Sequence, residues 1–186
     1  MNPALLIVDV INHFEYAGGA ALARQAAGLA SRVRELRDRF DAKSRPVVYC
    51  NDNWTEWQGD FVDLIAACRR QGGSSAQLAE RLSPRPEHYY ILKPRHSAFM
   101  ATALSTLLEQ LRIDRLVITG IATDSCVLAT ALDAHMRDYP LWVPRDGTTA
   151  RTPALKSAAL HLLRHTCGAD TRPSARHRVV FPTATQ

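Results

Sequence analysis

The stretch ALLIVDV, from Ala4 to Val10, is an apolar run with a single charge, Asp9, near its end. It lacks the alternation of polar and apolar residues that marks a half-exposed strand, so it predicts a strand buried on both faces of a sheet. Four similar runs follow along the chain: PVVYCN (Pro46–Asn51), YYILK (Tyr89–Lys93), RLVITG (Arg115–Gly120) and LWVP (Leu141–Pro144). We therefore predict five buried strands, with a short sixth at Ala169–Thr171.

The segments between these runs have helical character. The leucines at 104, 107, 108 and 111, for example, recur at the spacing of one helix face. Predicted helices span Ala20–Asp41, the later part of Trp57–Gln71, Ser74–Arg81 (helix or turn), Thr102–Leu111, Ser125–Asp138 and Pro153–Thr166. Strands and helices in alternation predict an α/β fold: a three-layer, doubly wound, mostly parallel sheet of five to six strands with helices on both faces, Rossmann-like in outline.

Length and composition fit one globular domain. The chain has 186 residues, of which 46% are hydrophobic and 22% are charged. We expect a domain over residues 1–173 and a loosely held tail over residues 174–186. No apolar run approaches the roughly 20 residues of a membrane span. Met1–Val10 carries no basic region or cleavage site, so we expect no signal peptide and a cytoplasmic protein.

The formal net charge is +5, and most of the basic residues are arginines. Those of the first predicted helix are interleaved with acidic residues, and those near the C-terminus have no aromatic platform beside them. We interpret both groups as solvated surface and expect no nucleic-acid partner. The cysteines form no CxxC pair, which argues against a disulfide framework and a zinc knuckle; they are Cys50, Cys68, Cys126 and Cys167.

Three predicted strands end at residues that can do chemistry together. Asp9 and Lys93 lie at the ends of the first and third strands, and Cys126 follows the fourth strand at the start of a helix. Ligands of parallel sheets bind beyond the carboxyl ends of the strands. The helix start and a nearby ammonium favour a thiolate, and a carboxylate can move the proton of the thiol to a leaving amine. The set predicts acyl transfer with Cys126 as nucleophile.

Each of these residues also has an ordinary structural interpretation when it is taken alone. A cysteine at a helix start is often a small packed residue, and an aspartate after a strand often caps a turn. A lysine before a proline, as Lys93 before Pro94, is often a surface residue. Their joint placement at one edge of the sheet favours the catalytic interpretation.

Four stretches carry a resemblance to a known family: LLIVDVINHF, ILKPRHSAF, VITGIATDSCVLATALDA and VPRDGTTA. The chain resembles the isochorismatase-like cysteine hydrolases, which include nicotinamidase, N-carbamoylsarcosine amidohydrolase and ureidoacrylate amidohydrolase. The resemblance covers nearly the whole chain, and GIATDSCV is its most specific part. It implies a triad in which Cys126 is the nucleophile, Asp9 its base and Lys93 the cation that tunes both.

The resemblance has further implications. It implies a cis peptide bond between Ile121 and Ala122, and an oxyanion hole formed by the N–H groups of Ala122 and Cys126. It implies hydrolysis of a C–N bond in an amide, ureido or carbamoyl compound through a thioester, with Asp9 as base in both halves of the reaction. It also implies a homo-oligomer, either a dimer or a tetramer.

The segment after the second strand differs from that of the metal-dependent nicotinamidases. Their pattern is Asp-x-His followed by a second histidine, whereas this chain has Asp52 and then Trp54, with no histidine before His88. A lone carboxylate does not make a metal site, because neutral imidazoles normally complete one. We therefore expect no metal and no cofactor.

Residues near the strand ends are candidates for contact with the substrate. Asn51 and Asn53 can hydrogen-bond it or form Asx turns, and Trp57, with Trp54, can wall a pocket or form a lid or interface. Phe14 and Phe99 are candidates on the same grounds, although Phe99 is equally suited to the core. His13 and His96 are either pocket or structural histidines, and Asp124 and Ser125 are expected to cap the Cys126 helix.

Three other functions remain open from the sequence. Isochorismatases proper cleave a vinyl ether on a similar scaffold, and some lack the cysteine. A small-molecule binding module without catalysis could use the same fold. A redox sensor would need a second cysteine near Cys126, for which Cys50 is the candidate.

Overall fold

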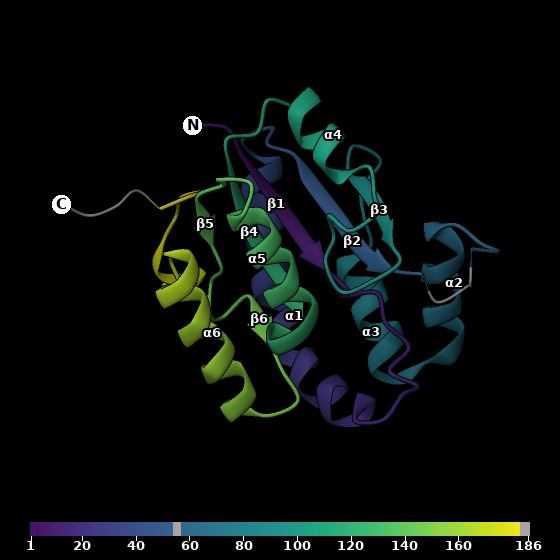
Figure 1. Cartoon of the computed structure of the whole chain (residues 1–186). Coiled ribbons are helices and arrows are strands. Elements are labelled where there is room, and N and C mark those ends of the chain that lie inside the picture. The colour runs from purple at the N-terminus through teal and green to yellow at the C-terminus, as the bar shows by residue number, and fades with distance from the viewer. Residues whose placement is uncertain (54–56, 183–186) are drawn as a thin grey trace.

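The computed structural model describes residues 1–53 and 57–182. Its core is a six-stranded sheet with β1 (Pro3–Val8) at the centre (Figure 1). The strand order is β3-β2-β1-β4-β5, and β6 pairs with β4. The other strands are β2 (Val47–Asp52), β3 (Tyr89–Lys93), β4 (Arg115–Ile121), β5 (Leu141–Trp142) and β6 (Thr148–Thr149). Every strand pair in this described part is parallel, which confirms the predicted sheet.

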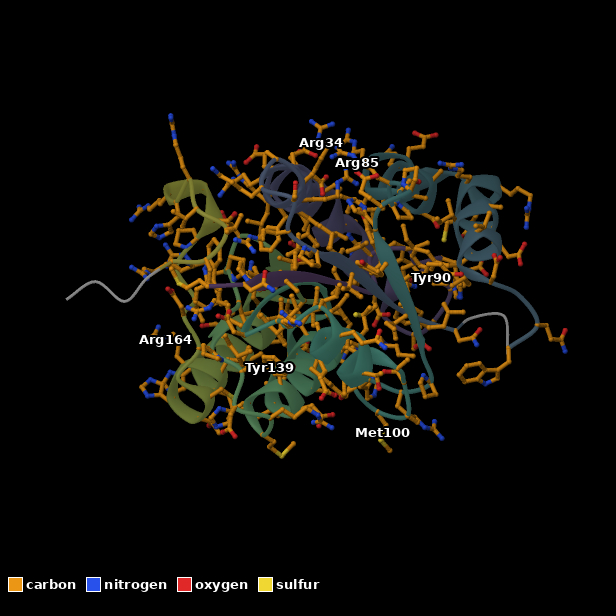
Figure 2. All side chains as sticks on the ribbon, turned by 90° about the horizontal axis from the view of Figure 1, so that it is seen from above. Arg34, Arg85, Tyr90, Met100, Tyr139 and Arg164 are labelled. Carbon is orange, nitrogen blue, oxygen red and sulfur yellow. The ribbon has the colours of Figure 1, made fainter. Side chains whose placement is uncertain are left out.

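Alternate residues of β1 enter two separate cores. Leu5 and Ile7 pack with α1 (Gly19–Asp41), α2 (Phe61–Gln71) and α3 (Gly73–Leu82). Leu6 and Val8 pack with the helices of the other face, α4 (Leu104–Gln110), α5 (Leu128–His135) and α6 (Pro153–Cys167). Figure 1 shows α5 in front of the sheet and α1 behind it, and the view from above in Figure 2 shows helices on both sides. The predicted three layers are confirmed.

The segment between β2 and β3 forms two helices separated by a glycine. Asp60 caps α2, because its side chain accepts hydrogen bonds from the N–H groups of Val62 and Asp63 at 2.7 and 3.0 Å. The helix ends at Gly72, whose φ of 79° favours glycine, and α3 begins directly afterwards. None of the described helices combines the length and the apolar character needed to cross a bilayer.

The predicted sixth strand is wrong in position. In the segment Ala169–Thr171, only Asp170 forms a bridge, an isolated one with Trp142. The sixth strand is Thr148–Thr149, which pairs with Gly120 and Ile121 of β4. Two polar residues after a turn-forming Asp146-Gly147 give no apolar run, so the pattern could not indicate this strand.

Several residues of the expected tail contact the rest of the domain. Ser174 begins a short 3-10 turn, η2 (Ser174–Arg176), and is fully buried. Its N–H and hydroxyl donate to the carboxylate of Asp146 at 2.6 and 3.1 Å. Phe181 packs against Trp142 and lies beneath the Arg115 guanidinium, 5.2 Å from ring centroid to Cζ. The division of the chain at residue 173 remains a prediction.

Candidate active site

The register of the strands brings the chemical residues to one edge. Val8 lies opposite Cys50 of β2 and Gly120 of β4, and Asp52 lies opposite Lys93 of β3. Asp9, the residue after β1, therefore emerges beside the carboxyl ends of β2 and β4. Gly120 has a φ of 115°, and a Cβ on it would lie 2.0 Å from the Val8 carbonyl oxygen. Glycine is required there for the two strands to approach this closely.

Asp9 and Lys93 form a buried ion pair. Lys93 Nζ lies 2.8 Å from Asp9 Oδ2, and the two residues are 0% and 4% exposed. The other oxygen of Asp9 accepts the Asp52 N–H at 2.6 Å. Lys93 Nζ also donates to the Arg95 carbonyl at 3.2 Å and to Cys126 Sγ at 3.5 Å. Each hydrogen of the ammonium thus has an acceptor, which offsets the cost of burying the charge.

The two charges affect one another. Burial raises the pKa of Asp9, although Lys93 and the thiol of Cys126 lower it in part. Burial opposes the charge on Lys93, but Asp9 and then Cys126 outweigh it, so the pKa of Lys93 is raised. We conclude that Lys93 stays an ammonium at neutral pH. A carboxylate with a raised pKa is a better proton acceptor, because it binds a proton more tightly than an ordinary carboxylate does.

Cys126 lies in η1 (Thr123–Val127), a π-helical turn that leads into α5, and is 8% exposed. Burial, and then the charge of Asp9, raises the pKa of its thiol to about 12, although Lys93 acts in the opposite direction. A thiol whose pKa is raised in this way keeps its proton near neutral pH, so a base must remove it before the sulfur attacks. The expected capping is wrong: the N-cap is Ala122, without a side-chain cap, and Ser125 contacts His96 instead.

A cavity of about 310 Å³ opens above the nucleophile. Asp9, Ala122 and Cys126 line it, as the sequence predicted. The peptide bond between Ile121 and Ala122 is cis, at the position that the resemblance implies. A larger hollow of about 460 Å³ lies beside α6, where Figure 2 labels Arg164, but no cysteine or other member of the triad lines it. The smaller cavity is the candidate active site.

The comparisons with known proteins agree with this geometry. Residues 3–174 match the family model described as the isochorismatase domain. The chain belongs to the isochorismatase family. It is 35% identical over 169 residues to the uncharacterized isochorismatase family protein YaaI of Bacillus subtilis (strain 168), covering 91% of this chain and 92% of that protein.

Two relatives of this isochorismatase-family hydrolase have named activities. The chain is 28% identical over 156 residues to a maleamate amidohydrolase of Pseudomonas putida, covering 78% of this chain and 71% of that protein. It matches the crystal structure of N-carbamoylsarcosine amidase from Thermoplasma acidophilum with a TM-score of 0.72 and 28% identity, over 94% of this chain and 97% of that one. The family assignment and the fold are therefore established together.

The cavity also contains residues that the sequence analysis did not predict. Asn12 and Tyr16 lie on the loop after β1, and Arg151 follows β6. Because β6 was not recognised, nothing indicated that Arg151 would reach this edge. The sequence left His96 open as either a pocket histidine or a structural one. It lines the cavity, and its Nδ1 lies 3.5 Å from Cys126 Sγ. The segment KPRHSAF, which follows a strand end, was the signal available for it.

None of the five predicted substrate-binding residues lines the cavity of this family member. For three of them the prediction is corrected, because their side chains are used in the fold. Asn51 is fully buried and exchanges hydrogen bonds with the backbone N–H and C=O of Ile11 at 3.2 and 2.8 Å. Phe14 packs in the core of the α1 face. Phe99 packs in the other core, beneath the Arg137 guanidinium.

Asn53 and Trp57 flank a segment outside the described residues, which contains Trp54. Trp57 is 66% exposed, and its N–H donates to Asn53 Oδ1 at 3.3 Å. Their contact with a substrate remains a prediction.

The residues at the cavity do not fit the metal site of the nicotinamidases. Asp52 lines the cavity, and one of its oxygens accepts the N–H of Asn53 at 2.8 Å. Across residues 1–53 and 57–182, no group of three ligand atoms from histidine, cysteine or carboxylate side chains converges on Asp52. The one such group in that part of the chain is elsewhere, at Asp41, Glu87 and His88. A single carboxylate does not provide the donors that such a metal site needs.

Proposed function

We propose that this protein is a cysteine-dependent hydrolase that cleaves a C–N bond of a small amide, ureido or carbamoyl compound through a thioester. One observation carries the proposal: the Lys93 ammonium contacts both Asp9 Oδ2, at 2.8 Å, and Cys126 Sγ, at 3.5 Å, beneath a cavity that the base and the nucleophile line. The named activities of the relatives, maleamate amidohydrolase and N-carbamoylsarcosine amidase, support the choice of bond.

The first half of the reaction follows from the pKa directions. Because the resting thiol is protonated, Asp9 must take its proton as the sulfur attacks the carbonyl carbon. A C–S bond forms, and the electron pair of the C=O bond moves to oxygen. When the carbonyl re-forms, the C–N bond breaks, and Asp9 gives the proton to the departing nitrogen. Lys93 holds the carboxylate in place and offsets the negative charge that moves between it and the sulfur.

The oxyanion is proposed to rest on the N–H groups of Ala122 and Cys126. Both residues line the cavity beside the reacting sulfur. Cys126 lies in the first turn of the helical segment, where backbone N–H groups lack intrahelical acceptors. Donors of this kind stabilise a tetrahedral intermediate because they are in place before charge develops.

The proposal is tested by screening amides, ureas and carbamoyl compounds for release of ammonia or amine. Each compound is supplied with and without a carboxylate group, because Arg151 lines the cavity. Hydroxylamine added during turnover converts a thioester to a hydroxamate, which reports the covalent intermediate directly. Cys126→Ala is the blank. Turnover of a vinyl ether that survives in Cys126→Ala would favour the isochorismatase reaction instead.

We also propose that the protein acts in the cytoplasm as a homo-oligomer, a dimer or a tetramer, and binds a small molecule rather than a nucleic acid. The isochorismatase family assignment and the small size of the cavity support this setting. Sedimentation velocity over a range of protein concentrations measures the oligomeric state, and a monomer at all concentrations would contradict it.

A further inference from the structure

His96 has one ring nitrogen beside the nucleophile. Its Nδ1 is 3.5 Å from Cys126 Sγ and 3.3 Å from Ser125 Oγ. The Ser125 hydroxyl carries a hydrogen that it can donate to Nδ1. We therefore assign Nδ1 as the acceptor in this contact. The lone pair of a base then faces the reacting sulfur.

The loop that carries His96 is held on both sides. Before it, the Arg95 carbonyl accepts a hydrogen bond from Lys93 Nζ at 3.2 Å. After it, the Ala98 N–H donates to Thr130 Oγ1 of α5 at 3.0 Å. The backbone is thus tied both to the catalytic lysine and to the helix that follows the nucleophile. The imidazole itself is exposed and lines the cavity, so it is a positioned base with access to water.

Asp9 is placed differently. It is almost fully buried, and its two oxygens already accept hydrogen bonds from the Lys93 ammonium and the Asp52 N–H, at 2.8 and 2.6 Å. This carboxylate is well placed to exchange a proton with the adjacent thiol and with a nitrogen leaving the bound substrate. His96 lines the same cavity and is exposed, so its imidazole is accessible to water.

We propose that His96 is a second acid–base catalyst of this site and that it serves hydrolysis of the thioester, an inference that rests on the proposed function. A water molecule attacks the thioester carbonyl and gives one proton to His96 Nδ1. As the intermediate collapses, the C–S bond breaks and its electron pair stays on sulfur. The imidazolium then returns the proton to Cys126 Sγ, 3.5 Å away, and the acid product leaves. Asp9, whose proton left with the amine, is already a carboxylate.

This division of work gives the two halves of the reaction different bases, Asp9 for acylation and His96 for deacylation. The other charged and titratable groups that line the same cavity are Asp9, Tyr16, Asp52, Asp124, Cys126 and Arg151, and Lys93 is buried next to Cys126. The carboxylates among them offset the charge of the imidazolium while it holds the proton.

The test is His96→Gln, which keeps a polar side chain but removes the base. Because acylation uses Asp9, kcat/KM for an amide substrate stays unchanged, whereas kcat falls about a hundredfold and KM falls by the same factor. Rapid-quench measurements show one equivalent of amine released quickly and the rest slowly, and intact mass spectrometry shows the acyl-enzyme. Added imidazole restores turnover. His161→Gln, an exposed histidine on α6, is the matched control and behaves as the unmodified protein.

Two results would overturn the proposal. One is an unchanged kcat in His96→Gln with no acyl-enzyme. The other is a parallel fall in kcat and kcat/KM without a burst, which would place His96 in acylation. The proposed function fails separately: if Cys126→Ala releases amine at the normal rate, there is no thioester, whatever His96→Gln does.

Discussion

Cys50 and Cys126 are two buried thiols near the same carboxylate. Burial, and then the charge of Asp9, raises the pKa of both thiols. Cys50, in β2, is fully enclosed in the core and contacts the Val48 carbonyl at 3.9 Å. Cys126 instead lines a cavity and contacts Lys93 and His96, each at 3.5 Å. Burial and charge therefore do not distinguish the two thiols. The open space beside the sulfur and the groups able to move its proton distinguish them.

The largest expected effect separates the two cysteines by activity. Cys126→Ala removes the nucleophile and lowers kcat by a factor on the order of 10⁴ or more, because the residual rate comes from binding and oxyanion stabilisation alone. Cys50→Ala keeps kcat within about threefold, because a core change away from the reacting atoms acts on stability. Ammonia release measures both. Equal losses in the two variants would show that the comparison is wrong.

Lys93→Met makes the surroundings of Cys126 resemble those of Cys50. It leaves Asp9 buried without its cation, so we expect a loss of about 3–5 kcal/mol in the free energy of unfolding, together with loss of turnover. Urea denaturation measures the first effect. The double variant Asp9→Asn/Lys93→Met removes both charges, and we expect it to recover much of the stability but no activity. A double variant as unstable as Lys93→Met would contradict the ion-pair explanation.

The two thiols should differ in alkylation by iodoacetamide. With a pKa of about 12, Cys126 reacts slowly near neutral pH, and its rate keeps rising above pH 9, where a free thiol reaches its plateau. Cys50 reacts only after denaturation. The raised pKa also means that the unfolded chain loses this proton first, so its contribution to stability is complete below pH 9.0 and is lost as the pH rises towards 12. A plateau in the rate at pH 7 would indicate a resting thiolate.

The smallest effect is expected for Cys50→Ser. The serine places a hydroxyl where the sulfur made one weak contact, and it should cost about 1–3 kcal/mol in the free energy of unfolding. Thermal unfolding followed by circular dichroism measures it, with Cys68→Ser on α2 as the comparison. A loss of turnover in folded Cys50→Ser would show that Cys50 has a part in the chemistry.

Most of the fold could be predicted because its strands are apolar runs and its helices are periodic. The segment Tyr89–Lys93 was predicted as a strand with the boundaries that it has in the structure. The short strand Thr148–Thr149 could not be predicted, because its pairing with β4 is a tertiary contact without a local pattern. The hydrogen bonds of Ser174 to Asp146 were missed for the same reason, since they join residues that are distant in sequence.

The candidate active site could also be predicted only in part. Asp9, Lys93 and Cys126 could be placed together, because the ends of parallel strands meet at one edge. The direction of a side chain could not be predicted: Asn51 is at that edge but points into the fold, where it holds Ile11. The raised pKa of Cys126 could not be predicted either, because its burial was unknown and burial has the largest effect on that pKa.

Gly120 has a consequence for how this active site can change. The strand that carries the base and the strand that leads to the nucleophile approach so closely that one added methyl group would overlap the Val8 carbonyl, 2.0 Å away. The close approach of these two strands thus requires a residue without a Cβ at position 120. New substrates can be accommodated by varying the loops around the cavity, whereas this position leaves hardly any freedom for substitution.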